Sequence, residues 1–173
     1  MVRRESLEET RADRRQMDTA RGETVAIAVE LHRLLNGGGW HGPALFELLA
    51  DVTPQEAAAR PLPGAHGIWE LLSHLTGWTE VALRRLDGIA TEEPAAGDFP
   101  EAPAPTPSAW AAAQARMREA TDRLIARLPR LGASDLDGPV IGRPHDTRYM
   151  LCGLVHHLAY HAGQIALLKK LAR

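Results

Sequence analysis

Three histidines have the spacing and the surroundings that metal ligation requires. His157 and His161 lie four positions apart in an apolar stretch with helical periodicity, so both fall on one face of a helix, about one turn apart. Two imidazoles in that relation can ligate one divalent ion, as they do in zinc-binding helices. His74 lies in a second apolar helical segment, residues 69–78. We therefore predict that the two helices pack together and that His74, His157 and His161 ligate one divalent metal.

The alternative interpretation is a histidine-rich core without a metal. A His-x-x-x-His pair alone is more typical of hydrogen-bonded core histidines or of a half-exposed patch. Burying imidazoles among apolar residues is unfavourable unless each nitrogen has a partner, and a metal supplies one. Acidic residues are scarce on these helix faces, and Glu70, one turn before His74, is the main candidate acceptor. Adding His74 to the pair favours the metal.

Four short motifs contain or flank these residues. They are Trp40-His41-Gly-Pro, the run Gly64-Ala-His66-Gly-Ile-Trp-Glu70-Leu, His74 with Trp78, and the terminal His157-x-x-x-His161-x-Gly-Gln164. Together they resemble the DinB family, which belongs to the DinB/YfiT-like superfamily of metal-dependent enzymes. The resemblance covers roughly residues 24–172. It implies a four-helix bundle with one divalent metal on three histidines, one from the second long helix and two from the last, at the positions named above.

A three-histidine site would be suited to catalysis. Three neutral imidazoles leave at least one coordination position open, which is typical of catalytic and not of structural metal sites. A metal bound there lowers the pKa of a water or of a thiol at that position. Ligation by three histidines does not select the metal. We expect zinc or nickel first, with iron(II) and manganese as alternatives.

The reaction is inferred mainly from the resemblance. Proteins similar to this chain include thiol S-transferases that use low-molecular-weight thiols such as mycothiol or bacillithiol, and a maleylpyruvate isomerase. The residue after His157 is Leu158, so the glutamate base of His-Glu-x-x-His enzymes is absent. We therefore predict a metal-dependent thiol S-transferase that acts on a small electrophile. The alternatives are a metal-dependent hydrolase and a non-catalytic metal-binding module of a stress response.

The roles of several further residues stay open from the sequence. His41 and His66 lie in motifs that match the family pattern, and Glu70 is either a base or an acceptor that orients a ligand. Tyr160 lies about 60° from His157 around the helix and could donate to a metal-bound group. Packing is the simpler interpretation of the tryptophans in these motifs, Trp40, Trp69 and Trp78.

Composition excludes several classes of protein. Aromatic residues make up 5% of the chain and alanine and leucine are plentiful, which favours helices over sheets. A net charge of −2 provides no general attraction to nucleic acid. The single cysteine, Cys152, fits a reducing compartment and lies away from the helix face of His157. Neither a signal peptide nor an apolar stretch of about 20 residues is present, so we expect a cytoplasmic protein without a membrane partner.

Hydrophobic periodicity and capping signals predict an all-α chain. Helices are expected over residues 25–35, 68–86, 109–128 and from 146 or 147 to the C-terminus, with two short helical pieces between 43 and 60. Pro43 is expected at the start of the first piece, and Thr53 and Ser108 as N-caps. Residues 91–107 and 129–145 are expected to be long loops. We predict one four-helix bundle domain, residues 24–173, after an N-terminal extension, residues 1–23, that begins the first helix or frays.

The last predicted helix is apolar on nearly every side. Leu151, Val155 and Leu158 lie away from the face that carries the histidines. A helix that is hydrophobic all round is either central in its own domain or covered by a second chain. We therefore expect a homodimer that hides part of this helix.

Overall fold

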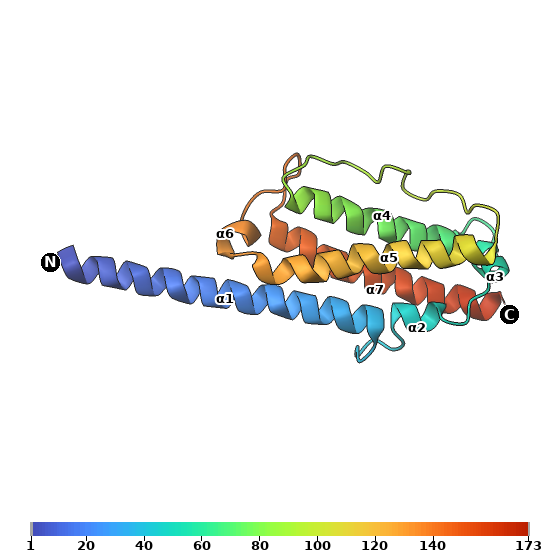
Figure 1. Cartoon of the computed structure of the whole chain (residues 1–173), viewed down its shortest axis with the longest axis horizontal. Coiled ribbons are helices and arrows are strands. Elements are labelled where there is room, and N and C mark those ends of the chain that lie inside the picture. The colour runs from blue at the N-terminus through green and yellow to red at the C-terminus, as the bar shows by residue number, and fades with distance from the viewer. Residues whose placement is uncertain (1, 173) are drawn as a thin grey trace.

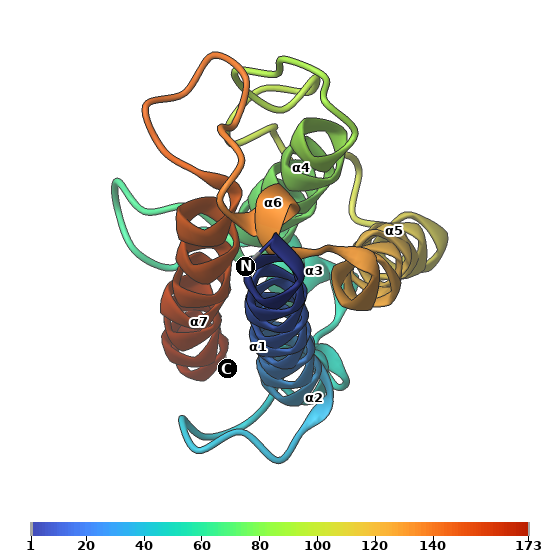
Figure 2. The same cartoon turned by 90° about the vertical axis from the view of Figure 1, so that its left-hand side faces the viewer.

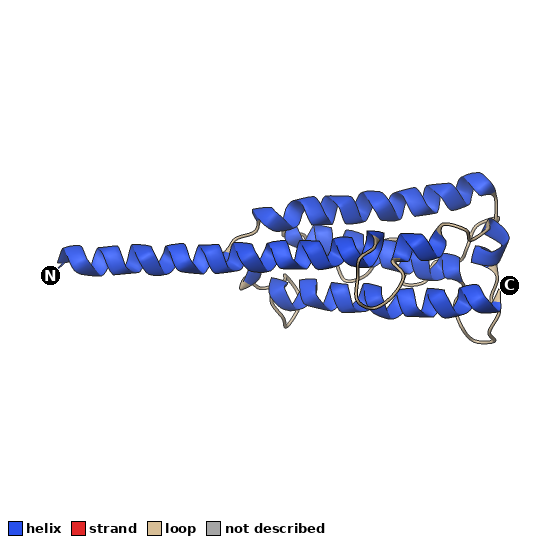
Figure 3. Cartoon of the chain, turned by 90° about the horizontal axis from the view of Figure 1, so that it is seen from below, coloured by secondary structure: helices blue, strands red, loops and turns tan. Residues whose placement is uncertain are grey.

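Four long helices make up the body of the molecule, and short helices connect them (Figure 1). The computed structural model describes the backbone of residues 2–172 and the side chains of residues 18–172. The long helices are α1 (Val2–Asn36), α4 (Ile68–Leu86), α5 (Pro107–Arg127) and α7 (Thr147–Leu171), and the short ones are α2 (Leu45–Leu49), α3 (Pro54–Ala58), the 3-10 helix η1 (Leu128–Arg130) and α6 (Ala133–Leu136). Residues 2–172 contain no strand (Figure 3), and the predicted all-α class is confirmed.

The long helices form a bundle, seen end-on in Figure 2. Helix α1 contacts α5 and α7, and α4 contacts the same two helices from the other side. Helices α4 and α5 run in the same direction, opposite to α1 and α7, and the N-terminal part of α1 projects beyond the other three (Figure 1). Helices α4 and α7 are therefore antiparallel neighbours, which places their facing side chains in the interior of the bundle.

The parallel arrangement of α4 and α5 determines the path of the chain between them. Since both helices run in the same direction, residues 87–106 must return along the length of the bundle before α5 can begin (Figure 1). This crossover segment approaches α4 closely at Gly77, where a Cβ atom would stand 2.7 Å from the Cβ of Pro94. The glycine thus allows the segment to lie against the middle of α4, close to His74.

The bundle interior is filled mainly by leucines that recur at helical spacing. The long helices each supply fully buried apolar side chains, among them Leu31 and Leu35, Leu72 and Leu75, Met117 and Leu124, Leu151 and Leu158. Burying one such side chain stabilises the fold by about 1.5–3 kcal/mol. A core of this size can support the bundle without help from a metal.

The helix ends confirm some capping predictions and correct others. The Thr53–Glu56 capping box and the Asp146 N-cap are present, with Asp146 accepting a hydrogen bond from the backbone of Tyr149. The N-cap of α5 is Thr106 and not Ser108, because Pro107 fits the first helical position and Thr106 then caps it. Helix α2 begins after Ala44, so Pro43 lies before it.

The remaining differences from the sequence-based expectations lie near the C-terminal part of the chain. The predicted loop 129–145 contains most of η1 and the short helix α6. Leu151 and Leu158 are fully buried inside the chain itself, so they provide no surface for a second subunit. No helix among the described residues is long and apolar enough to cross a membrane.

Candidate metal centre

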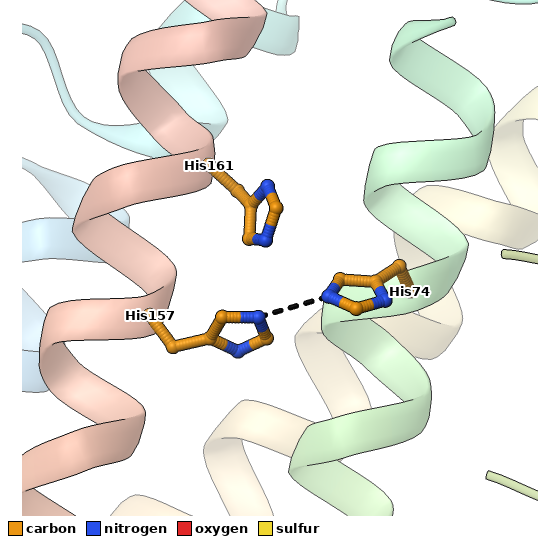
Figure 4. A group of neighbouring side chains, drawn as sticks. All are labelled: His74, His157 and His161. Atoms are coloured by element: carbon orange, nitrogen blue, oxygen red, sulfur yellow. Dashed lines mark hydrogen bonds between the residues drawn. The ribbon is translucent and has the colours of Figure 1, made fainter. Parts of the chain in front are cut away.

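The histidines that the sequence singled out lie together between α4 and α7 (Figure 4). His74 comes from α4, and His157 and His161 from successive turns of α7. One ring nitrogen from each histidine lies within 4.8 Å of those of the other two, and the Nε2 atoms of His74 and His157 are 2.8 Å apart. The antiparallel packing of α4 against α7 therefore brings His74 to the pair of histidines on α7, which helical spacing alone could not establish.

Two of the three rings are held by hydrogen bonds through the nitrogen that faces away from the cluster. The Nδ1 of His74 donates to the backbone carbonyl of Asp98 at 2.8 Å and lies 3.0 Å from the carboxylate Oδ1 of the same residue. The Nδ1 of His161 donates to Oε1 of Gln164 at 2.8 Å. A neutral imidazole with its proton on Nδ1 presents a lone pair on Nε2, so both rings offer Nε2 to the interior of the cluster.

This donor set fits a divalent metal. Two nitrogens on one tetrahedral zinc ion stand about 3.3 Å apart, given bonds of about 2.0–2.1 Å, and the separations in the cluster bracket that value. The outward hydrogen bonds to Asp98 and Gln164 are of the kind that orients ligating histidines. The three histidines can thus hold a metal ion, and ligation itself stays a prediction.

Burial keeps His157 and His161 in the protonation state that metals require. His74 and His161 are 4% and 7% exposed, and His157 is half-buried. Burial, together with the neighbouring His161 and His74, lowers the pKa of His157 to about 4. Burial also lowers the pKa of His161, although its hydrogen bond to Gln164 acts in the opposite direction. Both rings are neutral near pH 7 and can act as ligands.

The crossover segment closes one side of the site with an aromatic ring. Phe99 stacks on His74 at a centroid distance of 4.0 Å and, on its other face, on His66 at 3.8 Å. Its neighbour Asp98 accepts a hydrogen bond from Nε1 of Trp78 at 2.7 Å. Residues 98 and 99 therefore fix the ring of His74 by both a hydrogen bond and stacking.

Glu70 does not orient His74, which corrects one interpretation that the sequence left open. Its carboxylate pairs with Arg60 and accepts a hydrogen bond from the backbone N–H of Gly67 at 2.8 Å. His66 lies 3.8 Å from the same carboxylate. Burial raises the pKa of Glu70, but the bonds to Arg60 and Gly67 outweigh it and the net pKa is lowered. Glu70 therefore caps the N-terminus of α4 through Gly67 and is not free to act as a base.

The other residues considered in the sequence analysis lie outside the histidine cluster. Trp40 and His41 are exposed and lie in the connection between α1 and α2, and Cys152 lies outside the histidine cluster. Trp69 is buried against Trp110 at a centroid distance of 5.0 Å, which is a packing role. Tyr160 is 65% exposed and meets His161 edge to face at 5.0 Å, so it lies at the rim of the site.

Two cavities reach the histidines from opposite directions along α7. One of about 290 Å³ ends at His157, and its lining includes Trp78, Arg85, His145 and Tyr149. The other, of about 420 Å³, ends at His161 and is lined mostly by apolar and aromatic side chains, among them Leu71, Phe99, Tyr160 and Leu167. The cluster thus lies between two spaces that small molecules could enter.

Asp98 and Phe99 are the site residues that sequence reasoning missed. They lie in a proline-rich segment with no helical periodicity, so nothing local indicates that they face His74. The one available signal was the length of the segment, since long ordered loops in compact domains often cover a site.

Comparison with known proteins supports the resemblance drawn from the motifs. A family model described as the DinB superfamily matches residues 40–165, a range that includes the three clustered histidines. Searches of curated proteins and of solved structures find no match. Because the matched range covers well over half of the 173 residues, the predicted family is confirmed: this chain belongs to the DinB superfamily.

Proposed function

We propose that this protein binds a divalent metal through His74, His157 and His161 and is a metal-dependent thiol S-transferase. The observation that carries the proposal is that the Nε2 atoms of His74 and His161 are turned inward by hydrogen bonds on their Nδ1 atoms, beside His157 and two cavities. When bound, a divalent ion supplies Lewis acidity that lowers the pKa of a thiol at an open coordination position.

The residues of the chain would position the two substrates. The cavity at His157 and the cavity at His161 are large enough for one small molecule each, and each is lined by one histidine of the cluster. In the transfer, the sulfur of the thiol forms a bond to the electrophilic carbon, the thiol proton passes to solvent, and the leaving group departs with its electron pair. The apolar lining and the ring of Phe99 limit the access of water to this point.

The hydrolase alternative is less well supported by the carboxylates around the site. Hydrolysis commonly needs a carboxylate free to act as a general base. Asp98 already accepts from Trp78 and from His74, and Glu70 is paired with Arg60. Among the described residues, no acidic side chain belongs to the histidine cluster. A thiol needs less assistance, because coordination itself favours loss of its proton.

We expect zinc or nickel as the metal, with iron(II) or manganese as alternatives. All-nitrogen ligation by imidazoles suits zinc, nickel and iron, while manganese prefers oxygen ligands. Elemental analysis of protein purified without a polyhistidine tag identifies the metal that is bound on purification.

The test of the reaction is a turnover assay. Protein loaded with zinc, and separately with nickel, is offered a panel of low-molecular-weight thiols together with 1-chloro-2,4-dinitrobenzene, whose chloride is the leaving group. We expect thiol-dependent turnover that is abolished by His161→Ala. His156→Ala is the matched control, because His156 is exposed on the same helix and lies outside the cluster.

Two other outcomes would favour the alternative functions. Metal-dependent cleavage of an ester or amide without turnover of any thiol would indicate a hydrolase instead of a transferase. The second outcome would indicate a non-catalytic metal-binding module. In that case metal would bind with full occupancy, but azide or thiol would leave the absorption spectrum of the cobalt-substituted protein unchanged, because no coordination position is open.

A further inference from the structure

Arg85, which lines the His157 cavity, and Arg143, which shares a carbonyl acceptor with it, lack a carboxylate partner among the described residues. Arg85, in the last turn of α4, directs Nε and Nη2 at the backbone carbonyl of Thr91, at 3.0 and 2.8 Å. Arg143 donates to the carbonyl of Glu92 at 2.6 Å, and Arg85 reaches the same carbonyl at 3.2 Å. Among the described residues neither forms a salt bridge, while Arg60, Arg116 and Arg148 each do. Two positive charges therefore lie close together without an anion.

The positive charge of Arg85 is partly buried although no carboxylate in the described part of the chain balances it. Arg85 is half-buried, and its guanidinium lies 5.7 Å from the ring centroid of Trp78, which contacts His74 in a T-shaped arrangement. Burial and the charge of Arg143 both lower the pKa of Arg85, which means that its charge is unfavourable in the absence of an anion. An anionic group in the cavity would relieve both effects.

The cavity connects this charge to the candidate metal ligands. Arg85 and His145 line one part of the space of about 290 Å³, and His157 lines another. Between them the lining is apolar, with Ala82, Met150 and Leu154. A ligand that fills the space would thus carry an anionic group at one end, a short apolar body, and its reactive group at the end near His157.

We infer that this cavity binds a small molecule through a carboxylate held by Arg85, with Arg143 adding positive charge, and that the ligand is the thiol substrate or its acceptor. The inference rests on the proposed function for the identity of the reacting group, but the carboxylate recognition stands on the arginines and the cavity. Two acidic side chains near the cavity are already occupied, since Asp98 accepts from Trp78, and Asp146 caps α7. They would not replace a ligand carboxylate.

The first experiment measures binding alone, so that it does not depend on the reaction. Metal-free protein is titrated calorimetrically with 3-mercaptopropionate and with the uncharged 3-mercaptopropan-1-ol, which differs only at the carboxylate end. We expect the acid to bind at least about tenfold more tightly than the alcohol, because a charge-assisted hydrogen bond to an arginine is lost in the alcohol. Arg85→Gln should remove that difference, and Arg143→Gln should reduce it.

The matched control is Arg84→Gln. Arg84 is the exposed neighbour of Arg85, donates to the Thr91 side chain, and does not line the cavity. This substitution should leave the preference for the acid unchanged. Arg85→Lys keeps the charge and should retain part of the preference, which separates anion binding from a purely structural role in holding Thr91. Melting curves of all variants check that each is folded.

The second experiment determines whether the carboxylate bound in the cavity belongs to the thiol substrate or to its electrophilic acceptor. In the turnover assay, the KM of the thiol is compared between the acid and the alcohol, and the KM of the electrophile between 4-chloro-3-nitrobenzoate and its uncharged amide. A carboxylate preference confined to the thiol assigns the cavity to the thiol, and one confined to the electrophile assigns it to the acceptor.

Failure of this inference is separable from failure of the proposed function. If no thiol is turned over but Arg85-dependent carboxylate binding persists, only the transferase is wrong. If turnover occurs and Arg85→Gln changes the binding of the acid and the alcohol equally, the carboxylate site is wrong. Equal binding of the two thiols to the wild-type protein would also overturn it.

Discussion

The Nε2 atoms of His74 and His157 lie 2.8 Å apart, although 83 positions separate the two residues in the chain. One nitrogen of His74 is already committed to Asp98 on the outer side, so its inner nitrogen is an acceptor. Without a metal, the contact requires a proton on Nε2 of His157, while a metal would be bound by the lone pairs of both. The contact is thus a hydrogen bond in the metal-free protein, and in the metal-bound protein the same two nitrogens would be ligands.

The three histidines should behave as one unit in metal binding. We expect about one divalent ion per chain in protein purified without a polyhistidine tag, because three imidazoles converge on one point. His157→Ala or His161→Ala should reduce the metal content to near zero after dialysis, and His156→Ala should not. Elemental analysis measures the content. A wild-type protein free of metal, or equal loss in the His156 variant, would contradict the site.

Asp98 should contribute to metal affinity although it is not a ligand. Asp98→Asn removes the negative charge beside Nδ1 of His74 while the backbone carbonyl remains. We expect the metal dissociation constant to rise about tenfold, the lower end of the range for residues that orient ligands. Competition with a chromophoric chelator measures it. Glu101→Gln, an exposed acid in the same segment, is the control and should have little effect.

Gln164 should orient His161 by accepting its Nδ1 proton. Gln164→Leu removes the acceptor at 2.8 Å, so we expect metal affinity to fall about tenfold. Gln164→Glu keeps an acceptor oxygen and should retain affinity. If the leucine variant binds metal as tightly as the wild type, the hydrogen bond has no role in ligation.

The ion pair of the buried Glu70 with the exposed Arg60 should make stability depend on pH in the acid range. The pKa of Glu70 in the folded protein is lowered from its ordinary value of 4.5, so its contribution is fully present above about pH 4.5 and is lost as the pH falls through the lowered pKa. Glu70→Gln should reduce the free energy of unfolding by about 1–3 kcal/mol at neutral pH, and by less below pH 4.5. Denaturant titrations at several pH values measure the difference.

The control for this prediction is an exposed ion pair. Glu80→Gln removes the partner of Arg116, a pair at the surface, and should cost only about 0–1 kcal/mol. A loss for Glu70→Gln that is the same at pH 3 and pH 7 would show that the carboxylate charge is not what stabilises the entry of α4.

The homodimer stays a prediction, now with a different surface. Val25 and Val29 of α1 are each 41% exposed, one turn apart, beside a groove between α1 and α7 that Val155 helps to line. We expect a dimer at micromolar concentration in sedimentation equilibrium, and a shift to monomer in Val29→Asp because a charge would be buried. Leu167→Asp, at a different exposed site, should leave the dimer intact. A monomeric wild type would refute the expectation.

The sequence by itself determined the features that depend on local geometry. The helical period of about 3.6 residues places His157 and His161 on one face, with Gln164 one turn further along. Capping chemistry predicted the start of α7 at Asp146 or Thr147, of which Asp146 is the N-cap, and the capping box at Thr53. These features follow from residues within a few positions of one another, so no knowledge of the packing is needed to infer them.

The tertiary structure alone decided which distant residues complete the site. Asp98 meets His74 because α4 and α5 are parallel, which forces residues 87–106 back along the bundle. Arg60, rather than His74, takes the carboxylate of Glu70. Leu151 and Leu158 are covered by neighbouring helices and not by a second chain. Each outcome depends on helix direction and the path of a loop, and hydrophobic periodicity records only which face of a helix is buried, not what lies against it.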